Sequence, residues 1–525
     1  MSATVLQLML STAQVNDLHW DGGTLWAATG GGVEIWDADG ERLGHEVDGL
    51  PRAAVLSIGE SGGHIVAGTE AGAAVRENGR WQLLNDVPTV AILPEGALSR
   101  DGWLHPIDGG SPADFRSGGP IADAVSVDGI IVTGTLTGTV QVFGERLHTI
   151  QLPGTVMDLS ATDGGVRVAL STGAVEISLD GAVRRQPVAA TGAGPLWGTA
   201  DGQLIDSDGV VGHLPAPVWQ TVSVAPGVTV AGTPDGLYRL GPEGLDRLTP
   251  AGQICGNFIT GLTRWRGALV ASTFQDGACV QAEDGTWEPL EGLPSTMINA
   301  VLADGDDLLL ASSAGLVRMA PDGSVGVTGV ETAETPRRAP GLHHPSVTSL
   351  ARGEKLWITD LAGPIAVDSR GRWRRYRYHV WSTSNQRISA CGPEAWVATE
   401  DAGVSWFDGV QWQHFDALTG LPDDWIMAVA CDGRRAGFAG TYQDGVWRFD
   451  GSAWTELAGL PDPWVLSLLP DAGSLWAGTM GGLYRWDGQW SAAVPGLPDP
   501  RVHALRAEDG VLWVGTESGL AQITN

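Results

Sequence analysis

Turns in the second half of the chain place carboxylates beside aromatic rings. Asp423-Asp424-Trp425 and Tyr442-Gln443-Asp444 are two examples. Rings beside carboxylates suit the binding of a sugar or a peptide. The candidate residues of this kind are Phe274, Gln275, Asp276, Asp423, Asp424, Trp425, Tyr442, Gln443, Asp444, Asp462, Trp464, Asp499 and Arg501. The alternative is structural, because Gly-Leu-Pro-Asp and Gln-Asp-Gly also form tight turns.

The same carboxylates do not identify an enzyme. Glycoside hydrolysis requires two carboxyl groups at a defined separation, one of them with a raised pKa, and acidic turns in a sequence establish neither. The chain contains no nucleophile elbow, no phosphate-binding glycine loop and no HExxH motif. The adjacent His343 and His344 are weak support for a metal. We therefore expect no catalytic residue, no metal and no cofactor, with a carbohydrate-active hydrolase or lyase as the least favoured alternative.

A second candidate surface is basic. It consists of the proline-containing segment 331–345 and the stretch that follows it, with the candidate residues Arg337, Arg338, His343, His344, Arg372, Trp373, Arg374, Arg375, Tyr376 and Arg377. In a chain of formal net charge -30 this is a local reversal of sign. Arginine with aromatic rings is a composition that protein interfaces favour. One alternative is an outer strand whose charges protect a sheet edge, and another is a nucleic-acid site, which the overall acidity opposes.

Both surfaces depend on a repeat that returns about every 38 residues along the chain. Its clearest copy is SLWAGTMGGLYRWDGQW, residues 474–490. Leu475 to Thr479 is a short apolar run, typical of a strand buried on both faces and too short for a helix. A glycine-rich turn and the alternating Leu483 to Trp486 follow, and an outer strand is expected around Trp490. With the first strand of the next copy, this makes four strands per period, which is one blade of a β-propeller.

Most of the tryptophans are explained by this repeat. One set recurs on the apolar run and is predicted to form the core between blades: Trp26, Trp197, Trp357, Trp396, Trp476 and Trp513. A second set is predicted to mark outer strands: Trp81, Trp287, Trp412, Trp454 and Trp490. These rings report how the fold is built rather than what it binds.

The number of copies indicates all-β tandem propellers of about fourteen blades in two seven-bladed rings. The last copy stops after its third strand, whereas Thr4 to Leu10 is a spare strand before the first copy, so we expect circular strand closure. In the preferred wiring the spare strand closes blade seven and Leu245 to Leu248 crosses over to close blade fourteen, which gives domains 1–241 and 242–525. In the alternative the spare strand pairs with blade fourteen, and the second ring is inserted into the first.

Charge and cysteine usage predict the setting of the protein. A charge of -30 argues against nucleic acid or an anionic membrane surface as the main partner. No secretory leader or membrane-spanning run is recognised, so we expect no membrane insertion. The four cysteines form no CxxC pair, and small buried thiols are favoured over bridges. A reduced, cytoplasmic location fits this interpretation.

The repeat resembles that of the two-component regulator propeller family. The pattern is Leu-Trp-(Val/Ala)-Gly-Thr followed by Gly-Leu, and the resemblance is clear at 475–483, 512–520 and 231–237. The resemblance implies paired seven-bladed sensor propellers, here in a stand-alone soluble member, and carries over no catalytic residue. We expect a non-enzymatic binding or scaffolding module in a larger bacterial assembly, with a protein partner on the basic surface. The alternative is a sensor that binds a small molecule or glycan at the channel mouth.

Overall fold

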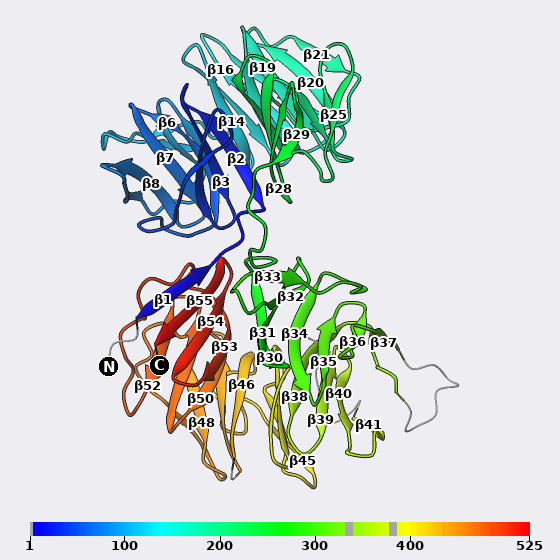
Figure 1. Ribbon diagram of the computed structural model, residues 1–525. Helices are drawn as coiled ribbons and strands as arrows, with labels where there is room; N and C mark the ends of the chain where they lie inside the picture. The colour runs from blue at the N-terminus through cyan, green and yellow to red at the C-terminus, as the bar shows by residue number, and fades with distance from the viewer. Residues whose placement is uncertain (1–3, 331–339, 377–385, 434, 525) are drawn as a thin grey trace. The chain divides into compact units, whose positions relative to one another are not determined.

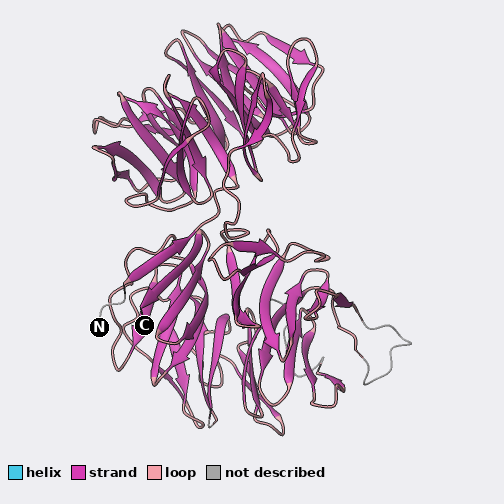
Figure 2. Ribbon diagram, in the orientation of Figure 1, coloured by secondary structure: helices cyan, strands magenta, loops and turns pink. Residues whose placement is uncertain are grey.

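The computed structural model describes residues 4–330, 340–376, 386–433 and 435–524. Across these ranges the chain consists of strands, turns and loops and forms no helix (Figure 2). In the described residues there is accordingly no helix that is long and apolar enough to span a membrane. The predicted all-β fold is confirmed.

The repeat forms the predicted sheet. In its clearest copy, strand β51 (Ser474–Thr479) is buried along its whole length, and β52 (Leu483–Trp486) is buried at its start and half-buried at its end. Gly478 of β51 lies against the next blade, because a Cβ atom there would approach the Val502 carbonyl oxygen to 2.7 Å. Glycine is thus required by the close approach of a neighbouring backbone, as the sequence predicted.

The recurring threonine locks the turn after the buried strand. The Thr479 hydroxyl donates a hydrogen bond to the Gly482 carbonyl oxygen at 3.0 Å, and Thr516 does the same to Gly519 at 2.8 Å. Both glycines have positive φ, 144° and 137°, which L-residues adopt only with strain. The Gly-Thr…Gly-Leu pattern is therefore explained by turn geometry.

The described ranges contain fourteen antiparallel sheets, and thirteen of them have four strands. The exception is β50–β51–β52, where Trp490 forms a single bridge to Trp486 instead of the predicted outer strand. The Ser491 hydroxyl accepts a hydrogen bond from the Arg485 N–H, and the Ser491 N–H donates one to the Arg485 carbonyl oxygen. An irregular segment therefore covers the outer edge of β52. The other outer-strand tryptophans, Trp81, Trp287, Trp412 and Trp454, lie in the fourth strands of their sheets.

The chain divides into two compact units, which we call the first unit (residues 11–251) and the second unit (residues 1–10 and 252–525). In the first unit the innermost strands of seven sheets contact one another in order, and the seventh contacts the first. These strands are β2 (Val15–Trp20), β6 (Val55–Ser61), β10 (Thr89–Leu93), β14 (Ile121–Val127), β18 (Val156–Thr162), β22 (Ala190–Gly192) and β26 (Gln220–Ala225).

The second unit repeats this cyclic arrangement. Its innermost strands also contact one another in order and return to the first. They are β30 (Ile259–Trp265), β34 (Ile298–Asp304), β38 (Val347–Arg352), β42 (Gln386–Cys391), β46 (Ile426–Gly433), β50 (Val465–Asp471) and β53 (Val502–Glu508).

Closure of the second unit corrects the preferred wiring. Strand β1 (Val5–Met9) pairs with β55 (Gly519–Thr524) and supplies the fourth strand of the last sheet, as Figure 1 shows by the blue strand beside the red ones. Strand β29 (Gly244–Arg247) stays in its own sheet, beside β28 (Gly236–Gly241), and does not cross over. The last sheet lacks a local fourth strand, whereas the sheet containing β29 is already complete.

The alternative wiring is correct in one part. It paired the spare strand with the last blade, but it inserted the second ring into the first. The observed nesting is the reverse, because residues 11–251 lie in sequence between β1 and the remainder of its unit. In the sequence, the boundaries between the units therefore fall between residues 10 and 11 and between residues 251 and 252, rather than at 241.

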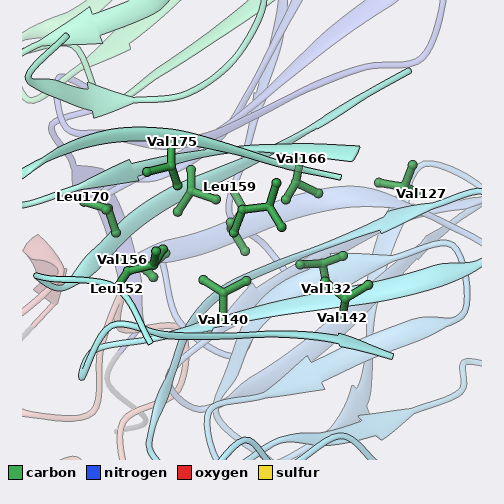
Figure 3. Close-up of a cluster of buried hydrophobic side chains, with 12 residues drawn as sticks. Val127, Val132, Val140, Val142, Leu152, Val156, Leu159, Val166, Leu170 and Val175 are labelled. Carbon is green, nitrogen blue, oxygen red and sulfur yellow. The ribbon is translucent and has the colours of Figure 1, made fainter. Parts of the chain in front are cut away.

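The core lies between neighbouring sheets. Figure 3 shows valine and leucine side chains, among them Val132, Val140, Leu159 and Val166, packed between the β14–β17 and β18–β21 sheets. All six tryptophans predicted to form the core are buried, and Trp357, Trp396 and Trp476 are at most 2% exposed. Burial of such large rings between blades is a main stabilising contribution to each unit.

The cysteines are bridged, which corrects the expectation of free thiols. Disulfides join Cys255 to Cys279 and Cys391 to Cys431, with Cα–Cα distances of 5.9 and 6.0 Å. The second bridge links β42 to β46, which are the inner strands of adjacent sheets. Adjacent inner strands bring the two Cα atoms within bridging range, a consequence of blade packing that spacing in the sequence does not reveal.

Candidate binding site

The predicted channel-mouth residues of the second unit lie on turns that hydrogen bonds hold together. In each of three sheets, the residue after the second strand donates its N–H to the residue before the first strand. These bonds are Phe274 to Phe258 (3.0 Å), Tyr442 to Trp425 (3.1 Å) and Met480 to Trp464 (3.1 Å). The two kinds of turn therefore lie side by side in each sheet, which places their side chains at the same end of the strands.

Three of the predicted rings form a continuous row, which we call the aromatic ridge: Trp425, Tyr442 and Trp464. Trp425 stacks on Tyr442, with ring centroids 4.4 Å apart and planes at 16°. Tyr442 in turn contacts Trp464 at 4.1 Å, with planes at 56°. Trp425 remains 41% exposed, unlike the tryptophans of the repeat core. An exposed ring fixed by stacking is a preorganised contact surface.

The carboxylates beside the ridge shape its turns. Asp423 accepts a hydrogen bond from the Trp425 N–H (3.1 Å), and Asp462 accepts one from the Trp464 N–H (3.2 Å). Asp462 also accepts from the Gly481 N–H. The structural interpretation of these acidic residues therefore holds, although one oxygen of Asp423 has no role in that turn. The same side chains can hold the ring in place and carry charge beside it.

Sequence reasoning missed one apolar neighbour of the ridge. Leu418 is 93% exposed in the loop between β45 (Trp412–Phe415) and β46. Asp424 accepts a hydrogen bond from Ala417 N–H at 2.7 Å, so the loop tip carrying Leu418 is tied to the segment that presents Trp425. The side chain has no place in the repeat pattern, and a fully exposed leucine at that position is the signal that could have identified it.

Phe274 belongs to a separate cluster. Its ring lies 5.2 Å from Phe258, which lies 4.8 Å from His503. His503 contacts Glu517 at 2.9 Å. Phe258, His503 and Glu517 were not predicted. Glu517 follows its second strand as Tyr442 does, and Phe258 precedes its first strand as Trp425 does, so the register of the repeat is the signal that could have found these two.

Asp499 and Arg501 lock the last sheet rather than face solvent. Arg501 pairs with Asp499 at 3.0 Å and also with Glu517. Asp499 is 1% exposed and accepts from the Ser518 hydroxyl at 2.9 Å. These two predicted residues are engaged within the protein.

The remaining predicted residues are at turn tips. Asp276 N–H donates to the Thr273 hydroxyl (2.9 Å), and Asp444 N–H donates to the Thr441 hydroxyl (2.7 Å), which is the turn lock of the repeat. Burial raises the pKa of Asp276. Gln275 and Gln443 are exposed at the same turns.

The basic surface is largely engaged within its own sheet. Strand β41 (Trp373–Arg375) is the outer strand of the β38–β41 sheet, as predicted. Trp373 is buried, and Tyr376 is buried against Trp357 with centroids 5.8 Å apart. Their rings are thus core and unavailable to a partner.

The arginines of this surface have partners within the sheet and its flanking segments. Arg372 pairs with Asp368, Arg374 lies 4.8 Å above the Tyr376 ring, and Arg375 donates to the Gly341 carbonyl oxygen at 2.9 Å. Arg372 and Arg374 are exposed. Three predicted residues, Arg337, Arg338 and Arg377, lie outside the described residues.

The histidine pair connects the end of the proline-containing segment 331–345 to strand β39 (Leu356–Asp360). The N–H groups of His343 and His344 both donate to Asp360, at 2.6 and 2.9 Å. His343 Nδ1 lies 3.4 Å from the same carboxylate, and the side chains of His343 and Asp360 are fully buried. Within the described ranges, the structure shows no group of three or more histidine, cysteine or acidic side chains placed to hold a metal.

Two of the cavities of the first unit, of about 430 and 1300 Å³, share lining residues that the sequence did not reveal. Asp17, Asp123 and Gln220 line both of them. Asp158 lines the smaller cavity. All three aspartates follow a Val-x-Asp or Ile-x-Asp pattern at the start of an inner strand, which is the signal that could have found them.

Each of these aspartates ties its blade to the next. The carboxylates of Asp17, Asp123 and Asp158 accept from backbone N–H groups of the following inner strand or its neighbourhood, at Ile58 (2.8 Å), Leu159 (2.7 Å) and Ala193 (2.6 Å). Gln220 joins the seventh blade of the unit to the first by accepting from Leu18 N–H at 2.8 Å.

Burial raises the pKa values of these carboxyl groups. The pKa of Asp17 rises to about 7 and that of Asp123 to about 6. The pKa of Asp158 is also raised, by burial and by the neighbouring charge of Asp123. Removal from water disfavours the ionised form, and the backbone N–H donors offset this in part.

Comparison with known proteins supports the fold. No protein-family model matches the chain, and no curated protein matches it. Among solved structures, PorZ, a bacterial surface component of the type-IX secretion system of Porphyromonas gingivalis, has a TM-score of 0.64 at 16% identity, covering 99% of this chain and 86% of PorZ. A GH74 enzyme from Niastella koreensis has a TM-score of 0.61 at 11% identity, covering 100% and 99%.

The extracellular domain of the hybrid two-component system BT4673 from B. thetaiotaomicron is a more distant match. Its TM-score is 0.41 at 16% identity, covering 99% of this chain and 82% of that one. At these identities the likenesses show a propeller fold alone. The two better matches are a secretion-system component and an enzyme, so they assign no activity to this chain.

Proposed function

We propose that the chain is a pair of seven-bladed β-propellers that acts as a non-enzymatic binding module, with the aromatic ridge as its recognition surface. The observation that carries this proposal is the exposed Trp425 ring, held by stacking on Tyr442 at 4.4 Å and by the turn that Asp423 shapes. Rigid, exposed aromatic rings dominate the binding energy of many interfaces because little entropy is lost when they bind.

A binding role suits the carboxylates better than catalysis does. Asp423 and Asp462 accept backbone hydrogen bonds that fix their turns, and Asp17, Asp123 and Asp158 accept bonds that join blades. A general acid must exchange its proton with a substrate, which competes with such structural bonding. Membership of the two-component regulator propeller family is consistent with this function and is part of the proposal.

The partner that we favour is a protein. The ridge combines large rings with the exposed Leu418, and this mixture is typical of protein-recognition surfaces. The basic surface of the β38–β41 sheet becomes a secondary candidate, because its rings are core and its exposed arginines are Arg372 and Arg374.

A glycan is the second candidate ligand. The observation that favours it is that Trp425 presents an exposed ring flanked by Asp423 and Asp424, and stacking of a sugar on such a ring is a common binding mode. Titration calorimetry with soluble polysaccharides tests it. Binding that Trp425→Ala abolishes would support the glycan sensor.

The cellular location stays a proposal. A cytoplasmic site was expected from free thiols, and both cysteine pairs are bridged instead. Structural disulfides persist in oxidising compartments, so the bridges favour a location outside the cytoplasm.

Affinity capture from lysate of the source organism tests the proposed function. Wild-type protein, Trp425→Ala and the control Val410→Ser are immobilised in parallel, and captured proteins are quantified by mass spectrometry. Val410 is 87% exposed at a turn outside the ridge, between β44 (Val404–Phe407) and β45. We expect a partner that the wild type and Val410→Ser retain and Trp425→Ala loses. Equal capture by all three proteins would exclude the ridge as the recognition surface.

A further inference from the structure

We propose that the occupant of the aromatic ridge is a basic segment of a partner protein, which places an arginine or lysine against Trp425 and an apolar side chain against Leu418. The inference rests on the proposed function, because it names the chemistry of the partner that the same surface binds. It is drawn from the charge, exposure and hydrogen bonding of the segments that build the ridge.

Every aspartate, glutamate, lysine or arginine in these segments is an aspartate. The loops 416–425, 441–445, 460–464 and 479–482 contain the acidic residues Asp416, Asp423, Asp424, Asp444 and Asp462, and they contain no lysine or arginine. Asp444 is exposed, and Asp423, Asp424 and Asp462 are half-buried. A partner of the same sign would be repelled, whereas a basic segment is attracted and steered toward the ridge.

The exposed part of the Trp425 ring offers a contact for a cation. Tyr442 covers one face of Trp425 in a stacked arrangement with 16° between the planes, and Trp425 is still 41% exposed. A guanidinium or ammonium group over an indole ring is attracted by the negative potential of the ring face. A planar guanidinium can also reach a neighbouring carboxylate while it stacks, so arginine fits better than lysine.

Leu418 adds an apolar contact at a fixed place. Its N–H donates to Asp416 Oδ1 at 3.0 Å, and Leu421 of the same loop is buried and packs in the core. The loop is therefore held at both sides of the exposed leucine. The Ala417 to Asp424 hydrogen bond ties the loop of the exposed Leu418 to the segment of the exposed Trp425, and a short peptide segment can contact two such side chains.

The charge contribution can be tested without damage to the turns. Asp423 and Asp424 each accept a backbone N–H, from Trp425 and Ala417. Asparagine keeps a carbonyl oxygen at the same position, so Asp423→Asn with Asp424→Asn removes two charges and preserves both hydrogen bonds. This double variant separates attraction by charge from presentation of the ring.

The experiment is a peptide array probed with the full chain. Arrays of 12-residue peptides of equal apolar content, differing in arginine, lysine and glutamate, are probed with wild type, Trp425→Ala, the Asp423→Asn/Asp424→Asn variant and Val410→Ser. We expect binders enriched in arginine or lysine, an affinity lower by about tenfold or more for Trp425→Ala, and a several-fold loss with a weaker salt dependence for the double variant. Val410→Ser should bind as wild type does.

Different negative results distinguish failure of the basic-partner inference from failure of the binding function on which it rests. Selection of acidic or neutral peptides would overturn the basic partner, and so would an affinity of the double variant equal to that of the wild type at both about 50 and about 300 mM salt. If lysate capture still depends on Trp425 in that case, the binding function stands and only its partner class is wrong. Selection of a polysaccharide in place of peptides would also overturn the basic segment and favour the glycan. Binding of basic peptides that Trp425→Ala leaves intact would overturn both proposals for the ridge.

Discussion

The carboxylate of Asp17 on β2 accepts a hydrogen bond from the backbone N–H of Ile58 on β6, the inner strand of the next blade, at 2.8 Å. The bond joins two blades through a side chain that lines the cavities of about 430 and 1300 Å³ in the first unit. Ring closure in this unit thus includes polar contacts between inner strands in addition to the apolar packing between sheets.

This relationship predicts that the first unit loses stability as pH rises. Burial raises the pKa of Asp17 from its ordinary value of 3.8 to about 7, so the folded state holds a proton that the unfolded chain releases. The stabilising contribution is complete below pH 4 and is lost as pH rises through about 7. The raised pKa values of Asp123 and Asp158 act in the same direction, and the net charge of -30 adds repulsion at high pH.

Calorimetric unfolding of the full chain between pH 5 and pH 8 measures this effect. We expect the transition of the first unit to move to lower temperature with rising pH, and Asp17→Asn to flatten that slope. Asparagine has one carbonyl oxygen and cannot accept hydrogen bonds from both Leu18 N–H and Ile58 N–H. The free energy of unfolding of the variant at pH 5 is therefore lower by on the order of 1 kcal/mol. The control is Asp208→Asn, an exposed turn residue of the same unit. A slope that is the same in wild type and Asp17→Asn would show that Asp17 ionises normally.

The disulfide between Cys391 and Cys431 predicts a redox-dependent second unit. It bridges adjacent inner strands with a sequence separation of 40 residues, so its loss increases the conformational freedom of the unfolded chain. Reduction, or the double change Cys391→Ser with Cys431→Ser, should lower the stability of the second unit by about 2–4 kcal/mol and leave the first unit unchanged. Thiol titration of the denatured, unreduced protein should detect no free thiol. Four titratable thiols without reductant would contradict both bridges.

Strand β1 predicts a dependence of the second unit on the N-terminus. Met9 of β1 is buried and pairs with Leu520 of β55. Deletion of residues 1–10 removes this strand, exposes the edge of β55 and uncovers apolar side chains of the last sheet. Hydrogen exchange at the β55 amides should accelerate, whereas exchange in the β2–β5 sheet should stay slow. Deletion of residues 1–3 is the matched control, and unchanged protection of β55 in the longer deletion would show that the pairing is dispensable.

Much of the fold could be predicted because the residues of the repeat are required by contacts within one copy or with the next copy. Gly478 is set by the approach of Val502, and Thr479 by the Gly482 turn, so both requirements lie within one copy and its neighbour. The closure could not be predicted in the same way. Whether β1 pairs with β55 or closes another sheet depends on which edge lacks a strand in three dimensions, and local sequence is compatible with either.

The candidate site was predictable in part for a related reason. Trp425, Tyr442 and Trp464 stand at turns that the repeat places at the same end of the strands, so their proximity followed from register. The failure at Trp373 and Tyr376 arises because neighbouring sheets cover both faces of this sheet. Trp373 packs in the core on one side and Tyr376 in the core on the other, so both rings are buried. The cysteine pairing was missed for the reason that applies to closure, since it depends on contacts between blades.

Two tryptophans with opposite roles provide the last prediction. Trp476, on the buried strand β51, is 2% exposed, and Trp425, on the ridge, is 41% exposed. Trp476→Ala should destabilise the second unit by about 3–5 kcal/mol, because it leaves a cavity between blades. Trp425→Ala removes a ring that rests on Tyr442 at the surface and should cost at most about 1 kcal/mol. Chemical unfolding of the two variants beside the wild type gives both values. A large loss of stability in Trp425→Ala would mean that the ridge is held for the fold, and its exposure would then carry no argument for binding.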